Sequence, residues 1–247
     1  MTEPAPRKSD LGVRVVSAVM MVAVAGAVLW LGGWVFGGFS IAVGFGVYWE
    51  WCGLVSKFAK GVLPRTGWFA FGLAYIGIAV IALITLRMSD LQPALLIVGI
   101  VIAVDIGAYF FGRTIGGPKI APKISPSKTW AGLLGGVTGA AMILAANDML
   151  SPWPISVFHQ VGWPTALLLL AATATIFAVV AQAGDFFESW MKRRAGVKDS
   201  SSLIPGHGGL FDRVDGLVAI LFVGGLVVLT IIASHVAAGG SLLPTPA

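Results

Sequence analysis

The sequence predicts an all-α protein: a polytopic bundle of about seven membrane-spanning helices that forms one integral-membrane domain over residues 1–247. Three observations predict this class. Hydrophobic residues make up 57% of the chain and charged residues only 11%, whereas a soluble domain has about 45–50% and about 25%. The apolar residues form runs of about 20, which is the length a helix needs to cross a bilayer. The basic residues fall between these runs, on alternate connections.

The same composition excludes other classes of protein. A disordered chain needs low hydrophobicity, and a disulfide-stabilised domain needs more than the single cysteine, Cys52. The net charge of +5 does not indicate a nucleic-acid-binding protein, because the bases lie in short stretches between apolar runs rather than on one exposed face. We therefore expect no nucleic-acid partner.

Seven segments are apolar and long enough to span a membrane as helices, which satisfy their own backbone hydrogen bonds in lipid. They cover residues 15–32, 35–55, 68–86, 92–112, 130–150, 164–184 and 214–236. Gly32 and Gly33 mark the break between the first two. Residues 1–13 are expected to form a cytoplasmic arm and residues 237–247 a flexible tail.

The distribution of basic residues predicts the orientation. The N-terminal arm and the second, fourth and sixth connections hold fifteen of the sixteen Lys and Arg residues, and the other connections hold only Arg87. Basic residues collect on the cytoplasmic side of membrane proteins. We therefore expect the N-terminus in the cytoplasm and, with an odd number of spans, the C-terminus outside.

The fifth predicted span contains glycines at the spacing of close helix contacts. Gly132 and Gly136, and likewise Gly135 and Gly139, are separated by three residues. Small residues at this spacing let two helix backbones approach. Packing within the chain is the preferred interpretation, and a homodimer is the alternative.

Polar residues concentrate around the end of the sixth span and the start of the seventh. Asp185, Glu188, Ser189 and Lys192 have the spacing of one helix face. Asp212 opens the seventh span, after a loop rich in Ser and Gly whose backbone N–H groups could approach a phosphate. Carboxylate oxygens beside Lys and Arg suit Mg²⁺ that holds a polyphosphate. The alternative is a set of helix-end charges that pair with one another at the headgroup boundary.

A second polar cluster lies near the cytoplasmic end of the fourth span. Asp105, Tyr109 and Arg113 fall on one helix face. An acid inside a membrane helix is costly and indicates a functional residue. The loop that follows contains bases and no acid, and its Ser127 is expected to cap the fifth helix, whose N-terminus attracts anions. A plain positive-inside loop would explain the bases but not the Ser-Pro-Ser-Lys-Thr-Trp order.

Residues 189–215 resemble a family signature. The pattern is Ser189-x-x-Lys192-Arg193-x4-Lys198-Asp199, then Pro205-x-His207-Gly208-Gly209-Leu210-x-Asp212-Arg213-Val214-Asp215. It resembles the signature of phosphatidate cytidylyltransferases, also called CDP-diacylglycerol synthases, and it fills every fixed position over 27 residues.

The resemblance extends, with gaps, over residues 100–220. The segments around Asp105, Ser125 and Asp185 are similar to further elements of the family, and Glu50 is weakly similar to its second span. The sequence departs from the family at Ser127, where a second Lys is common, and at Ala131, where a Glu is common.

The resemblance implies that CTP and phosphatidate react to CDP-diacylglycerol and diphosphate, with Mg²⁺ as cofactor and a monovalent cation as a candidate second ion. It implies a site at the cytoplasmic face of the plasma membrane, in a multi-pass protein of bacterial type. Asp185 and Asp212 are the first candidates for metal ligands, and Asp215 is the next. The candidates for catalysis through phosphate contacts are Lys192, Arg193, Lys198 and Arg213. The candidates for substrate binding or for holding the site together are Ser125, Lys128, Ser189, His207, Gly208, Gly209, Arg113, Asp105 and Tyr109.

Two alternatives stay open at this point. Another membrane enzyme of nucleotide-activated lipid chemistry, such as a CDP-archaeol-type synthase or a lipid kinase, would use the same magnesium chemistry on another lipid. An anion transporter would place its charges near the membrane midplane and often shows repeated halves. The charges here lie near the predicted cytoplasmic ends of spans, and no repeat is visible, which disfavours the transporter.

Overall fold

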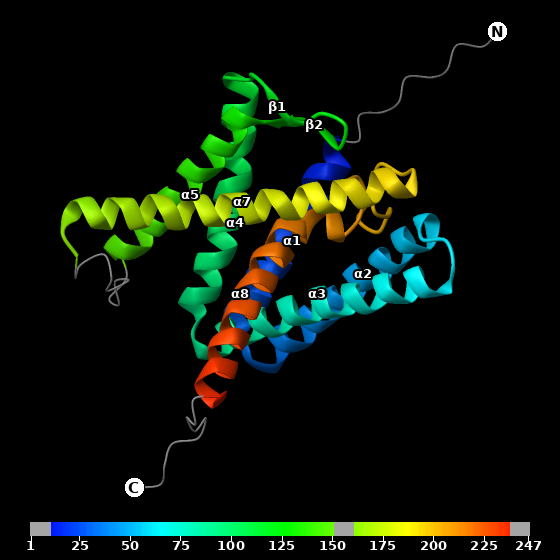
Figure 1. Ribbon diagram of the computed structural model, residues 1–247, viewed down its shortest axis with the longest axis horizontal. Helices are drawn as coiled ribbons and strands as arrows, with labels where there is room; N and C mark the ends of the chain where they lie inside the picture. The colour runs from blue at the N-terminus through cyan, green and yellow to red at the C-terminus, as the bar shows by residue number, and fades with distance from the viewer. Residues whose placement is uncertain (1–10, 151–160, 238–247) are drawn as a thin grey trace, which may run out of the picture.

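The computed structural model describes residues 11–150 and 161–237, and in this part of the chain seven helices are long and apolar enough to cross a membrane (Figure 1). This confirms the predicted fold class. In chain order the elements are α1 (Leu11–Leu31), α2 (Gly33–Phe58), α3 (Val62–Ser89), α4 (Leu91–Thr114), β1 (Lys119–Ala121), β2 (Ser125–Thr129), α5 (Trp130–Leu150), α7 (Trp163–Ala195) and α8 (Phe211–Ala237). The predictions for residues 1–10 and 238–247 lie outside the described residues.

Helix α7 is longer than the predicted span and carries the polar stripe beyond it. The prediction ended at residue 184, whereas α7 continues to Ala195 over 33 residues in all. Three basic residues lie in its last turn, where cations stabilise the negative end of the helix dipole. Gly196 then ends the helix in the left-handed conformation, with φ of 69°. The predicted carboxylate face is therefore one continuous helical surface.

The loop between α4 and α5 forms a two-stranded antiparallel hairpin that the sequence did not predict. Lys119 of β1 pairs with Thr129 of β2, and Ala121 pairs with Ser125. Because the strand continues to Thr129, the predicted cap at Ser127 is wrong. The side chain of Thr129 caps α5 instead, since its Oγ1 accepts a hydrogen bond from the Gly132 N–H at 3.0 Å.

The glycines of α5 pack directly against α4. A Cβ atom added to Gly132 would lie 3.0 Å from the carbonyl oxygen of Ala108. Added Cβ atoms at Gly135 and Gly139 would collide with the α4 backbone at Gly107 and Ala103. Packing within the chain, the preferred interpretation of the glycine spacing, is therefore confirmed.

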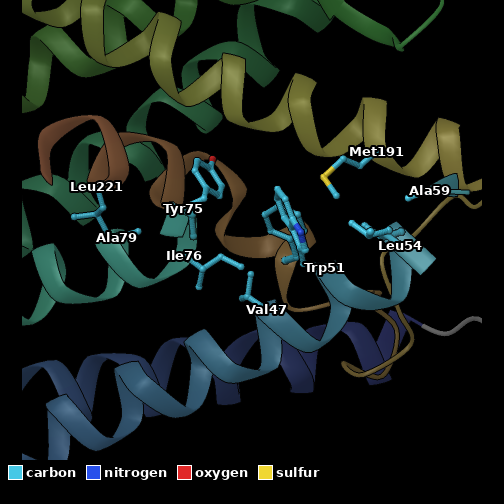
Figure 2. Close-up of a cluster of buried hydrophobic side chains, with 12 residues drawn as sticks. Val47, Trp51, Leu54, Ala59, Tyr75, Ile76, Ala79, Met191 and Leu221 are labelled. Atoms are coloured by element: carbon cyan, nitrogen blue, oxygen red, sulfur yellow. The ribbon is translucent and has the colours of Figure 1, made fainter. Parts of the chain in front are cut away.

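Trp51 of α2 is the centre of the larger core cluster. Figure 2 shows its indole among labelled side chains from α2, α3, α7 and α8. Trp51 is fully buried, and its Nε1 donates a hydrogen bond to the carbonyl oxygen of Trp68 at 2.9 Å. Gly72 of α3 faces the indole so closely that a Cβ there would overlap it. These contacts fix the C-terminal half of α2 against three other helices.

Segments that carry the predicted site residues meet at one end of the bundle. The hairpin, the end of α7, the loop between α7 and α8, and the start of α1 lie together in the upper right of Figure 1. Arg193 Nε donates to the carbonyl oxygen of Ile124 in the hairpin at 3.4 Å. At the other end of α1, Arg87 Nε donates to the carbonyl oxygen of Leu29 at 2.7 Å. The lone basic residue of the predicted outer connections thus lies away from the site.

Candidate active site

Three carboxylates from three helices form an acid cluster, which we define as Asp105 of α4, Asp185 of α7 and Asp215 of α8. They interact electrostatically with one another and with Lys128 of β2. Lys128 forms an ion pair with Asp185. Gly184 brings α7 and α8 close at this level, because a Cβ there would lie 2.6 Å from the carbonyl oxygen of Asp215. Three carboxylates and one ammonium leave a formal charge of −2 in this cluster.

A second group, the lysine network, consists of Lys192 and the carboxylates of Glu188 and Asp212. Lys192 forms ion pairs with Glu188, one helical turn earlier on α7, and with Asp212 of α8, where Nζ and Oδ1 are 2.5 Å apart. The side chains of Glu188 and Asp212 are 1% and 7% exposed. Burial keeps water from screening these charges, so their Coulomb attraction is stronger than in an exposed pair, and the loss of one partner would leave a costly unpaired charge.

Asp212 also holds the loop of residues 196–210. Its Oδ2 accepts hydrogen bonds from the Ser200 N–H at 3.0 Å, the Ser200 hydroxyl at 2.9 Å and the Gly209 N–H at 2.9 Å. It lies in the first turn of α8, where the helix dipole favours a negative charge. The Gly209 N–H, predicted to help form a phosphate cradle, therefore points at Asp212 in this structure.

Glu50 of α2 contacts the same loop. Glu50 is 2% exposed, and its carboxylate accepts hydrogen bonds from four donors. These donors are the hydroxyls of Ser200 and Ser201 and the backbone N–H groups of Leu210 and Phe211. The sequence showed Glu50 only as a weak resemblance. The signal that could have found it is an acid inside an apolar 26-residue helix.

The remainder of the loop is held by α1 and by Arg213. The Ser17 hydroxyl lies 2.8 Å from His207 Nδ1 and 3.1 Å from the carbonyl oxygen of Pro205. Arg213 donates two hydrogen bonds to the carbonyl oxygen of His207, from Nη2 at 2.5 Å and from Nε at 3.1 Å. Gly208 has φ of 82°, which favours glycine at this position. The role of Ser17 was not predicted, because its partners Pro205 and His207 lie 188 and 190 residues away in the sequence.

The other predicted residues lie around these two groups. The Ser189 hydroxyl donates to Asp185 Oδ1 at 3.3 Å. Ser125 is buried in β2, close to Lys128. Tyr109 and Arg113 contact each other on the exposed surface of α4, one and two turns beyond Asp105. Lys198 is exposed at the start of the loop.

The site therefore unites most of the predicted residues but divides the predicted metal ligands. Asp185 and Asp215 belong to the acid cluster, whereas Asp212 belongs to the lysine network. Within residues 11–150 and 161–237, no group of three or more His, Cys, Asp or Glu side chains is arranged closely enough to hold a metal ion as it stands. The assignment of the metal ligands thus stays a prediction.

The fold and this site define a multi-pass membrane protein in which carboxylates and lysines meet at one end of the helix bundle. The model of the cytidylyltransferase family matches residues 55–232, which is more than half of the chain. The chain is 33% identical to the phosphatidate cytidylyltransferase of Brucella suis biovar 1 (strain 1330), over 85% of this chain and 90% of that protein. It is also 33% identical to the phosphatidate cytidylyltransferase of Rickettsia bellii (strain RML369-C), over 89% of this chain and 93% of that protein. The chain belongs to the phosphatidate cytidylyltransferase family.

Proposed function

We propose that this protein is a phosphatidate cytidylyltransferase, which transfers the cytidylyl group of CTP to phosphatidate and releases diphosphate. The observation that carries the proposal is the meeting of the acid cluster and the lysine network near the end of α7, formed by residues of the family signature and of the further segments that resemble the family. Family membership supports the same reaction.

The reaction needs no nucleophile from the protein. A phosphate oxygen of phosphatidate attacks the α-phosphorus of CTP, a new P–O bond forms, and the bond to the β-phosphate oxygen breaks. The attacking phosphate is already anionic near neutral pH, as phosphomonoesters with a second pKa of about 6 are. The barrier is the approach of two anions and the charge on the leaving diphosphate, so positioning and electrostatic stabilisation dominate.

Lys128 and Lys192 are the cations that lie deepest in the site. Their side chains are 20% and 12% exposed, and each pairs with a carboxylate that the sequence predicts as a metal ligand. We assign them contacts with the substrate phosphates. Arg193, Lys198 and Arg213 lie at the exposed rim of the same site, where they would attract CTP and the lipid headgroup.

The donor set of the site fits Mg²⁺. Carboxylate oxygens are its preferred protein ligands, and the formal charge of −2 in the acid cluster favours a divalent cation. Gln182, one turn before Asp185, has a buried amide that makes no hydrogen bond within the described residues. We propose Asp185 as a ligand, together with Asp215 and with Asp212 once it exchanges its partner Lys192. Mg²⁺ would supply neutralisation of the triphosphate charge. A monovalent cation as second ion is part of the same proposal.

The proposed location is the cytoplasmic face of a bacterial plasma membrane. The bacterial relatives and the collection of basic connections at one end support it. At this face the headgroup of phosphatidate and cytoplasmic CTP can reach one site together.

The direct test uses the purified protein in detergent with dispersed phosphatidate, Mg²⁺ and CTP labelled in the α-phosphate. We expect the label to enter the organic phase, matched by an equal release of diphosphate, and EDTA to abolish both. Diacylglycerol in place of phosphatidate, with CTP labelled in the γ-phosphate, is the control that tests for a lipid kinase. If phosphatidate yields no labelled lipid while a related enzyme succeeds under the same conditions, the proposed acceptor is wrong.

A further inference from the structure

We propose that Glu50 is a positioning residue for the transfer reaction, which holds the loop of residues 196–210 on α2 and thereby sets the position of Asp212. The proposal rests on the proposed function of the site. It goes beyond it because Glu50 lies on another helix and outside the segment that the family model matches, residues 55–232.

Both oxygens of the Glu50 carboxylate are fully used. Oε1 accepts from the Ser201 hydroxyl at 2.5 Å and from the Leu210 N–H at 2.8 Å. Oε2 accepts from the Ser200 hydroxyl at 2.9 Å and from the Phe211 N–H at 2.7 Å. Four donors on a buried carboxylate offset the cost of removing its charge from water. This arrangement explains why an acid is tolerated inside α2.

Two of the four donors lie within the loop, and the other two lie where the loop joins α8. Ser200 and Ser201 directly follow Asp199 of the signature, and Leu210 and Phe211 directly precede Asp212. The N–H groups at the start of a helix have no partner within the helix. Glu50 satisfies two of them at the start of α8 while it also holds Ser200 and Ser201 within the loop. One side chain therefore fixes the distance between these two serines and the start of α8.

Ser200 couples Glu50 to Asp212. Its hydroxyl oxygen lies 2.9 Å from Glu50 Oε2 and 2.9 Å from Asp212 Oδ2. A hydroxyl has one proton, so it donates fully to only one of these carboxylates at a time. When Asp212 changes its partners, Glu50 can accept the whole hydrogen bond and keep Ser200 in place. Gly209 completes this packing, since a Cβ there would lie 2.9 Å from both Glu50 oxygens.

The base of this arrangement is rigid. Trp51, the neighbour of Glu50, is fully buried, and its ring centroid lies 5.9 Å from that of Phe211. The hydrogen bond from Trp51 to the carbonyl oxygen of Trp68 ties the same turn of α2 to α3. Glu50 therefore presents its oxygens from a fixed helix to a loop that has little regular structure of its own.

The test compares Glu50→Gln and Ser201→Ala with the wild-type protein, and Ser40→Ala is the matched control. Gln keeps the size of the side chain but replaces one acceptor oxygen with an NH₂ group that faces other donors. Ser201→Ala removes one donor and leaves the contacts to α8 intact, so it folds more readily. Ser40 is buried on the same helix, and its hydroxyl has no hydrogen-bond partner within the described residues.

Two readouts separate a positioning role from a purely structural one. For Glu50→Gln we expect kcat to fall by at least about tenfold while the KM for phosphatidate changes by less than about twofold, with a smaller fall for Ser201→Ala. Hydrogen exchange in peptides covering residues 197–214 should become faster in both variants, and peptides of α4 and α5 should not change. Ser40→Ala should match the wild type in both readouts.

The proposal is overturned if Glu50→Gln and Ser201→Ala keep wild-type kcat, or if exchange rises equally in α4 and α5. The exchange measurement needs no substrate turnover. A wild-type protein without cytidylyl transfer would thus contradict the proposed function, while unchanged exchange in residues 197–214 would contradict the role of Glu50.

Discussion

Asp212 and Asp185 have the same predicted role but different surroundings. The oxygens of Asp212 accept from Lys192, Ser200 and Gly209, whereas Asp185 pairs with Lys128 and accepts one long hydrogen bond from Ser189. Asp185 can therefore exchange partners at lower cost, because fewer donors would be left unsatisfied.

Replacing Asp185 with Asn removes the charge that Lys128 neutralises and that Mg²⁺ would use. We expect turnover to fall by at least about 100-fold, since a transition-state contact to a charge is lost. Steady-state assays at several Mg²⁺ concentrations measure this. The control is Asp90→Asn, because Asp90 caps α4 far from the site and Asn is an equally good cap. Undiminished turnover in Asp185→Asn would remove Asp185 from the metal proposal.

Gly209→Ala should disrupt the signature loop. A Cβ at this position would overlap the Ser200 hydroxyl and press on both Glu50 oxygens, so we expect a loss of about 1–3 kcal/mol in stability, typical of overpacking. Turnover should fall with it. Thermal unfolding in detergent measures the first effect. Gly53→Ala on α2 is the control, since nothing lies within 4 Å of its added Cβ.

The sequence identified individual residues of the site, but not the residues that they contact. Spacing and the resemblance identified Asp185, Lys192 and Asp212, and the structure brings all three together near the end of α7. The contact of Glu50 with Ser200 joins positions 150 residues apart, and no local pattern predicts such a pair. The cost of a buried charge indicates only that a partner must exist.

At the scale of elements, the α4–α5 pair depends on small residues more than any other pair described here. Gly135→Leu would force its side chain into Gly107 and Phe111 of α4. We expect the two helices to separate and the midpoint of thermal unfolding to fall, at a cost of about 1–3 kcal/mol or more. Gly77→Leu on α3 is the control, because its added Cβ meets nothing within 4 Å. Equal midpoints for the two variants would contradict the packing argument.

The helices could be predicted because each contains a long apolar run, whereas the residues at which they end were harder to predict. The apolar span was predicted to end at residue 184, and the helical spacing of the polar stripe predicted that the helix continues past it, but not that it ends at Ala195. The hairpin was missed because its strands have three and five residues and include Pro126. Its pairing is stabilised by contacts that lie elsewhere in the chain, such as the ion pair of Lys128 with Asp185.

At the scale of the whole molecule, the predicted orientation can be tested with single cysteines. In a Cys52→Ser background, we place a cysteine at Lys123 of the hairpin loop or at Ser89 near the end of α3, both exposed. A membrane-impermeant maleimide should label Ser89→Cys in intact spheroplasts and Lys123→Cys only after permeabilisation, because basic connections stay in the cytoplasm. The reverse labelling pattern would show that the orientation is opposite to the predicted one, and it would exclude a cytoplasmic site.

The whole architecture was predictable only in part. Composition and charge distribution gave the class, the number of spans and the expected sidedness. They did not give the neighbours of each helix, because in lipid the apolar surfaces of all helices are similar and small or polar residues select the contacts. The glycines of α5 were the one local signal of this kind, and they indicated an interface without naming α4 as the partner.

The length of α7 makes the protein sensitive to the thickness of the bilayer. A helix of 33 residues is about 50 Å long, whereas the hydrocarbon core is about 30 Å thick. The part of α7 that exceeds the hydrocarbon core carries Asp185 through Lys192 towards the headgroups. The difference between the length of α7 and the thickness of the core therefore sets how deep the site lies in the membrane. Reconstitution into lipids with progressively longer acyl chains should lower turnover once the thickened core covers Asp185, even when the amount of folded protein is unchanged.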